Sequence, residues 1–202
     1  MVKRSPKIQR GFSLVELVLV VAIMLAIAAM ALPKFLNFTA TYQLRGGLNA
    51  VSGVIQQARQ NAVRSNATIQ VVSSALGSTS TIYGDTNGNS SWDTTERGAQ
   101  LSKQIKIKTS GYPGDAYANV STYSVESQTT PIKFNARGLP CVVSGTLCQN
   151  LDASSGSSIP VGFVIYVQNT GKYGSTGWGA VTISPAGRVQ TWIWNGSAYS
   201  KQ

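Results

Sequence analysis

A single carboxylate, Glu16, lies inside the longest apolar run of the sequence. The run covers the 21 residues from Phe12 to Leu32, and Ser13 and Glu16 are its only polar members. A carboxylate in a hydrocarbon environment costs on the order of 3 kcal/mol, so such a group usually has a function and a partner. Glu16 follows Phe12 by four residues, about one helical turn. We therefore take Glu16 as a candidate functional residue.

A second group of oxygen-bearing side chains lies in the segment 85–96. They occupy positions 1, 3, 5, 7, 9 and 12 of this twelve-residue segment, a spacing that matches calcium-binding loops. The candidate calcium ligands are Asp85, Asn87, Asn89, Asp93 and Glu96. Calcium loops have glycine at position 6, where this sequence has Ser90, and no flanking helices are expected here. A solvated β-turn is the alternative interpretation.

The two cysteines, Cys141 and Cys148, enclose six residues in a stretch rich in Gly, Ser and Thr. This spacing differs from that of redox pairs and zinc knuckles, and it favours a small disulfide loop in an exported protein over a free thiol. The chain has no histidine, and it contains no nucleophile elbow, phosphate-binding loop or pair of catalytic carboxylates. We therefore expect a protein that is not an enzyme and requires no cofactor.

The chain is basic, with 17 Lys and Arg against 7 Asp and Glu and a formal net charge of +10. Four of these cations precede the apolar run: Lys3, Arg4, Lys7 and Arg10. By the positive-inside rule this end stays in the cytoplasm and the rest of the chain lies outside it. A basic surface attracts DNA or acidic lipid, but charge alone identifies neither partner.

One long helix must position Glu16. The run is long enough to span hydrocarbon as a helix, and it exceeds the core of about 7–15 residues that signal peptides have. Pro33 follows it and removes one helical hydrogen bond. Beyond Pro33, apolar residues spaced three and four apart form one amphipathic face: Leu44, Leu48, Val51, Ile55, Ala58 and Ala62. We expect a bent helix whose half 12–33 spans the membrane and whose half 34–65 contacts a globular head.

The head, residues 66–202, is expected to be rich in β-structure. Six β-prone runs are separated by Gly, Ser, Asn and Pro: 68–74, 104–109, 131–136, 161–168, 179–184 and 188–194. The last run has apolar or aromatic groups on both faces, which is typical of a strand covered on both sides. The sequence therefore predicts an α+β fold, in which the long N-terminal helix packs on an antiparallel sheet.

The segment GFSLVEL, residues 11–17, closely resembles the leader cleavage motif of type IV pilins and type II secretion pseudopilins. The resemblance implies that a prepilin peptidase removes residues 1–11 by cutting between Gly11 and Phe12, and that Phe12 is N-methylated. It also implies that Pro33 marks a bend or a melted turn of the helix in filaments. Cleavage would make the Phe12 amine cationic, so that Glu16 of one subunit could neutralise the amine of a neighbour.

Three short segments of the head resemble the minor pilins FimT and the minor pseudopilins GspH. They are QARQNAV at 57–63, FNARGLP at 134–140 and ISPAGRV at 183–189. FimT-like pilins that capture DNA resemble one another through Gly-Arg-x-Arg, and this chain has Gln190 in place of the second arginine. Cations proposed for such a DNA surface are Arg188, Lys172, Arg137 and Lys201, with Trp192, Trp194 and Tyr199 as stacking faces. In the alternative, Arg188 caps a hairpin and the tryptophans fill the core.

These resemblances imply a minor pilin or pseudopilin, a structural subunit that helps to initiate or cap a type IV pilus or a type II secretion pseudopilus. Its partners would be other pilin subunits and the prepilin peptidase, and it would be held in the bacterial inner membrane with its head in the periplasm. One alternative is a DNA-binding pilus component that serves DNA uptake in natural transformation. Another is a major pilin subunit.

Overall fold

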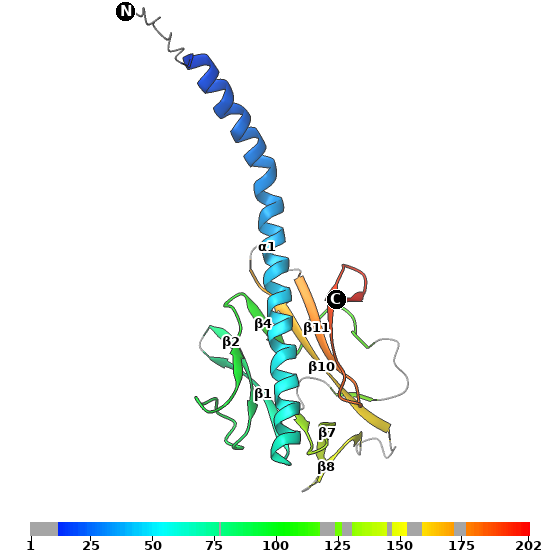
Figure 1. Ribbon diagram of the computed structural model, residues 1–202. Coiled ribbons are helices and arrows are strands. Elements are labelled where there is room, and N and C mark those ends of the chain that lie inside the picture. The colour runs from blue at the N-terminus through cyan, green and yellow to red at the C-terminus, as the bar shows by residue number, and fades with distance from the viewer. Residues whose placement is uncertain are drawn as a thin grey trace, which may run out of the picture. The chain divides into compact units, whose positions relative to one another are not determined.

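The computed structural model describes residues 12–76, 78–117, 124–126, 131–144, 147–152, 159–171 and 177–202. The chain divides into two units, Met1–Phe38 and Thr39–Gln202. Helix α1, Leu14–Ser65, supplies the described structure of the first unit and continues into the second (Figure 1). The other regular elements within the described residues are strands. The predicted α+β architecture, a long apolar N-terminal helix with antiparallel β-structure, is confirmed.

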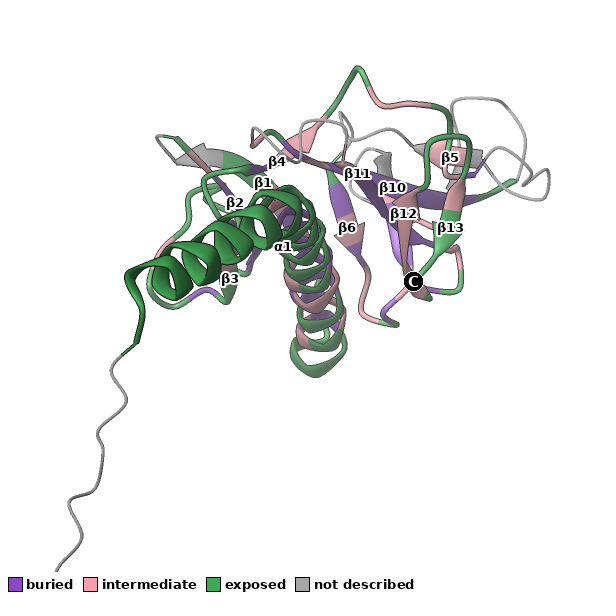
Figure 2. Cartoon of the chain, turned by 90° about the horizontal axis from the view of Figure 1, so that it is seen from above, coloured by how far each residue is buried: buried purple, intermediate pink, exposed green. Residues whose placement is uncertain are grey.

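The part of α1 in the first unit is apolar and exposed along its length (Figure 2). Large hydrophobic side chains on every side of the helix are exposed, from Phe12 at 79% to Phe38 at 67%. Pro33 lies inside the continuous helix. A helix that is hydrophobic all round is normally buried in lipid or protein, so this segment requires an apolar environment.

The part of α1 in the second unit packs through one face. All six residues of the predicted stripe are buried, and Ala40, Gly47 and Val54 are buried with them. The opposite face carries exposed polar side chains such as Gln56 and Gln60. The prediction of an amphipathic helix on a globular head is therefore confirmed for this stretch.

Two sheets face this helix. In the described part of the chain, the first sheet has six strands, in the order β3 (Gly98–Gln100), β2 (Thr79–Asp85), β1 (Ile69–Leu76), β6 (Ile132–Phe134), β7 (Pro140–Ser144) and β8 (Leu147–Gln149). The second has the path β13 (Tyr199–Lys201), β12 (Val189–Trp194), β11 (Gly177–Ile183), β10 (Ile159–Asn169) and β4 (Ile105–Lys108). Strands β5 (Ser124–Glu126) and β9 (Leu151–Asp152) also pair with β10. The β5–β10 pair is parallel, and the other described strand pairs are antiparallel.

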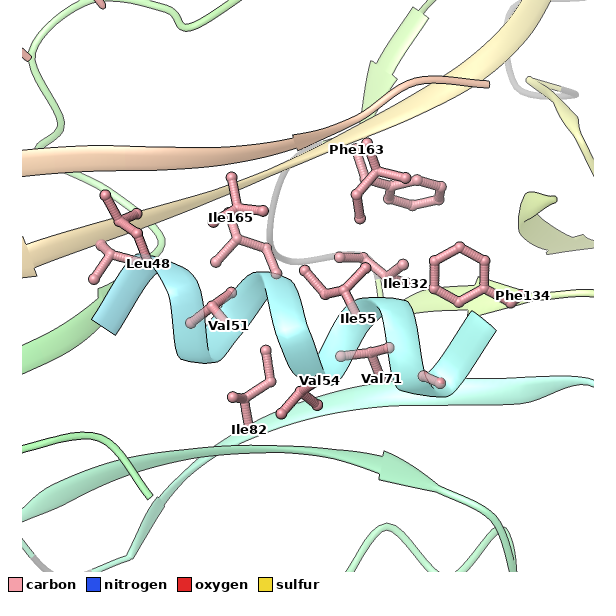
Figure 3. Packing of buried hydrophobic residues seen from close by; sticks show 14 of the residues in the cluster. Leu48, Val51, Val54, Ile55, Val71, Ile82, Ile132, Phe134, Phe163 and Ile165 are labelled. Carbon is pink, nitrogen blue, oxygen red and sulfur yellow. The ribbon is translucent and has the colours of Figure 1, made fainter. Parts of the chain in front are cut away.

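The main core lies between α1 and the inner faces of both sheets (Figure 3). Leu48, Val51 and Ile55 of the helix are fully buried, and so are Phe134 of the first sheet and Phe163 of the second. The helix and both sheets thus share one apolar core. Packing in this core positions the turns at the ends of the strands.

A second, aromatic cluster packs on the other face of the second sheet. Its buried members include Tyr166 and Trp178, and Trp192, Trp194 and Tyr199 pack against them. The Trp192 ring N–H donates to Thr182 Oγ1 at 2.8 Å, and Trp194 meets Tyr199 edge to face with ring centroids 5.1 Å apart. The aromatic groups proposed as stacking faces thus pack on the second sheet and are partly buried there. β12 is covered on both faces, since Val189 and Ile193 pack on the main core.

Candidate functional site

The N-terminal segment presents Glu16 in the first turn of α1. The first helical hydrogen bond runs from the Leu17 N–H to the Ser13 carbonyl at 3.1 Å, so Ser13 is the N-cap. Gly11 lies outside the described residues, while Phe12 and Glu16 are both exposed. A carboxylate in this turn also interacts favourably with the helix dipole, and Ser13 and Glu16 have the spacing of a capping box. Local capping is therefore a competing role for Glu16.

The exposed part of α1 has the composition of a membrane span. Its most apolar stretch has a mean hydropathy of 2.8, and none of that stretch is buried. The helix is long and apolar enough to cross a bilayer. This segment therefore has the length and composition of a membrane anchor, and Glu16 is its one acidic residue.

A second site forms where α1 meets two turns of the head. The Arg59 Nε donates to the Gly138 carbonyl at 2.9 Å, and its Nη1 donates to the Gly187 carbonyl at 3.0 Å. Each of these glycines closes a turn, because the Gly138 N–H bonds to the Asn135 carbonyl and the Gly187 N–H bonds to the Ser184 carbonyl. We call Arg59, Gly138 and Gly187 the Arg59 junction. One guanidinium thus ties the helix to a turn of each sheet.

The two glycines of the Arg59 junction cannot be replaced without strain. Their φ angles are +72° at Gly138 and +77° at Gly187, a region that side-chain-bearing residues rarely adopt. A Cβ on Gly187 would lie 2.9 Å from the Gly138 carbonyl oxygen and 3.0 Å from the Arg59 guanidinium. The segments 57–63, 134–140 and 183–189, each too short to be specific alone, therefore meet at one point.

Two family models match the chain. One, the prokaryotic N-terminal methylation motif, matches residues 6–32, and the other, type II transport protein GspH, matches residues 48–187. The chain belongs to the GspH family. It is a minor pilin or pseudopilin subunit, which assembles with other subunits of its class and is a substrate of prepilin peptidase. No solved structure matches it.

The loop 85–96 of this GspH-family chain connects β2 to β3. Asp85 and Glu96, at its two ends, are buried to 4% and 6% exposure, whereas Asn87 and Asn89 are exposed. Asp93 is hydrogen-bonded within the loop, and the bond from the Thr95 hydroxyl lowers the pKa of Asp93. Ser90 has φ +55°, so it adopts the backbone conformation that glycine was expected to provide at position 6. The structure thus places all five predicted ligands on one well-formed loop.

The cations predicted for DNA binding are only partly brought together. Arg188 and Lys201 line one cavity of about 250 Å³, together with Gln190. Arg188 also lines a neighbouring cavity of about 620 Å³ with Arg59 and Arg64. Arg137 lines neither of these two cavities, and Lys172 lies outside the described residues.

A disulfide links Cys141 of β7 to Cys148 of β8, with Cα atoms 5.3 Å apart. The two strands pair antiparallel, and Cys148 is in register with Val143. Cys141 is fully buried, so the link fixes the end of this hairpin to the head.

Sequence reasoning missed Arg59. Arg59 was noted only as part of the segment 57–63, although it lies on α1 beside the buried Ala58 and Ala62. An arginine at the border of a buried helix stripe is a usable signal, because its charge must find acceptors there. Which acceptors it finds depends on turns that lie 79 and 128 residues away.

Proposed function

We propose that the chain is made as a precursor, is cut between Gly11 and Phe12 and is N-methylated at Phe12. It then remains in the inner membrane, with its head, residues 66–202, in the periplasm, until it is incorporated at the end of a filament. The observation that carries this proposal is the fully exposed apolar half of α1 with Glu16 one turn from the new chain start.

The chemistry of that half favours assembly over a plain anchor. Lipid alone would satisfy the apolar side chains, but it would leave the Glu16 carboxylate without a partner at a cost of about 3 kcal/mol. A neighbouring subunit offers both an apolar surface and the cationic amine of its own Phe12. Stacked helices in which Glu16 meets that amine would therefore be held in a defined register.

Intact-mass measurement on the chain purified from membranes tests the processing step. We expect the chain to lack its first eleven residues and to carry one added methyl group on the amine of Phe12. Protease added to the periplasmic side should degrade the head and leave a protected fragment that contains residues 12–33. A chain that retains its leader in cells with an active prepilin peptidase, or a head resistant to periplasmic protease, would contradict the proposal.

DNA capture is a second candidate function, favoured by the shared cavity of Arg188 and Lys201. Two cations on one surface are a small phosphate-binding site, so binding should be weak and strongly dependent on salt. The observation behind this candidate is the pair of cations, since Trp192, Trp194 and Tyr199 are partly buried in the aromatic cluster.

A gel shift with the detergent-solubilised chain and duplex DNA over a salt series tests DNA capture. Arg188→Ala should reduce the slope of log affinity against log salt by about 1, because one phosphate contact is lost. Arg97→Ala, an exposed arginine next to β3 of the first sheet that does not line the cavity, is the matched control and should leave the slope unchanged. Equal effects of both variants, or no binding at about 50 mM salt, would exclude a specific site.

A further inference from the structure

We propose that the loop 85–96 between β2 and β3 binds a calcium ion, through side chains at its two buried ends and along its exposed turn. The proposal goes beyond the assembly function, because this loop belongs to the edge hairpin of the first sheet and includes no residue of α1.

The two ends of the loop are joined by hydrogen bonds to carboxylates. Asp85 accepts the N–H of Gly88 at 2.6 Å through Oδ1 and the N–H of Ser90 at 2.9 Å through Oδ2. Glu96 accepts the N–H of Thr86 at 2.9 Å through Oε1. The last residue of the loop thus lies against its second residue, next to Asp85, and the twelve residues close into a ring.

One buried carboxylate oxygen of this loop has no hydrogen-bond partner among the described residues. Glu96 Oε2 is buried and, within the described part of the chain, accepts no hydrogen bond. A buried carboxylate oxygen that accepts no hydrogen bond is costly, and a bound cation would satisfy it.

The other proposed ligand side chains are held in place by hydrogen bonds within the loop. Asn87 Oδ1 accepts the N–H of Asn89 at 3.0 Å, and Asn89 Oδ1 accepts the N–H of Ser91 at 2.7 Å. A carbonyl oxygen that accepts one hydrogen bond keeps a second lone pair, which is available to a metal ion. Asp93 accepts from Thr95 and from the Asn87 side-chain amide, which places it beside the same turn.

All the proposed ligand atoms are oxygens, and this chemistry favours calcium over other metal ions. No group of three His, Cys, Asp or Glu side chains among the described residues could hold a metal by itself. The proposed ligands are therefore mixed: carboxylates of Asp85 and Glu96, amide oxygens of Asn87 and Asn89, and Asp93 through water. Calcium accepts six to eight such oxygens in flexible geometry, whereas magnesium dehydrates reluctantly and zinc prefers nitrogen and sulfur.

Thermal unfolding of the detergent-solubilised full chain, measured with EDTA and with about 10 mM CaCl₂, tests the site. For a dissociation constant of about 0.1–1 mM, typical of extracellular modules, we expect calcium to raise Tm by roughly 3–10 °C. Magnesium at the same concentration should give a much smaller shift. Terbium(III) provides a direct probe, since Trp92 stacks on Tyr83 beside the loop and should sensitise its luminescence.

Glu96→Gln gives the sharpest test, because its two expected effects have opposite sign. The amide keeps an acceptor for the Thr86 N–H but removes the unpaired charge, so Tm in EDTA should equal or exceed that of the unaltered protein. The rise in Tm with calcium should be lost. Asp115→Asn, which alters a carboxylate bound to the Tyr166 hydroxyl outside the loop, is the matched control and should keep the full calcium response.

Two results would overturn the site. One is the absence of both a calcium-dependent Tm shift and terbium luminescence in the unaltered protein. The other is a calcium response that Glu96→Gln and the exposed-loop variant Asn89→Ala both retain in full. Asn89→Ala changes no charge and no buried atom, so it serves as the test if Glu96→Gln does not fold.

Discussion

Replacing Arg59 with alanine is expected to lower the free energy of unfolding of the head by about 2–3 kcal/mol. The substitution removes two charge-assisted hydrogen bonds, to the carbonyls of Gly138 and Gly187, and leaves both acceptors without their partner. The adjacent cavity of about 620 Å³ is large enough for water to reach the two carbonyls and replace part of the lost bonding, which keeps the estimate below the sum of two such bonds. Tryptophan fluorescence during thermal unfolding in detergent should show Tm lowered by roughly 4–12 °C.

Two further variants separate the geometry of the Arg59 junction from its charge. Arg59→Lys keeps the charge but has no planar fork, so it should recover less than half of the lost stability. Arg64→Ala removes an exposed arginine that lines the same cavity and should change stability by less than about 0.5 kcal/mol. If Arg59→Lys were as stable as the unaltered protein, the junction would depend on charge alone. If Arg64→Ala were equally destabilising, it would depend on the cavity as a whole.

The fold was predictable wherever a periodic pattern extended over many residues. The stripe from Leu44 to Ala62 predicted the buried face of α1, and each of the six β-prone runs overlaps a strand. The sequence did not reveal β2, although Ile82 and Tyr83 in it are fully buried. Its surroundings are rich in Thr, Ser and Gly, and its conformation is set by pairing with β1 over seven residues. Short strands such as β3 and β13 likewise depend on their neighbours more than on their own residues.

The candidate sites also differ in how far the sequence alone predicts them. The spacing of Gly11, Phe12 and Glu16 is local and could be recognised without coordinates. The Arg59 junction is a contact between segments 79 and 128 residues apart, so its parts look like unrelated short motifs until the chain is folded. In the loop 85–96 the spacing indicated calcium while Ser90 opposed it. The positive φ of Ser90 removes that objection, because the turn forms without glycine.

Replacing Glu16 with alanine is expected to reduce incorporation of this subunit into filaments by about tenfold or more, while membrane insertion and cleavage stay normal. An unpaired N-terminal amine in an apolar filament core costs about 3 kcal/mol, and each 1.4 kcal/mol corresponds to about a factor of ten. The measurement compares the amount of subunit in sheared filaments, or cross-linked to neighbouring subunits, with the amount in the membrane.

Control variants distinguish pairing with a neighbour from capping of the subunit's own helix. Ser13→Ala removes the N-cap and should weaken the helix start by about 0.5–2 kcal/mol without changing the charge of the segment. If capping were the whole role of Glu16, Ser13→Ala would reproduce the defect. Glu16→Gln keeps the polar group but not the charge, so ionic pairing predicts a defect close to that of alanine. Normal incorporation of Glu16→Ala would exclude pairing altogether, since the neighbour's amine would then need no carboxylate.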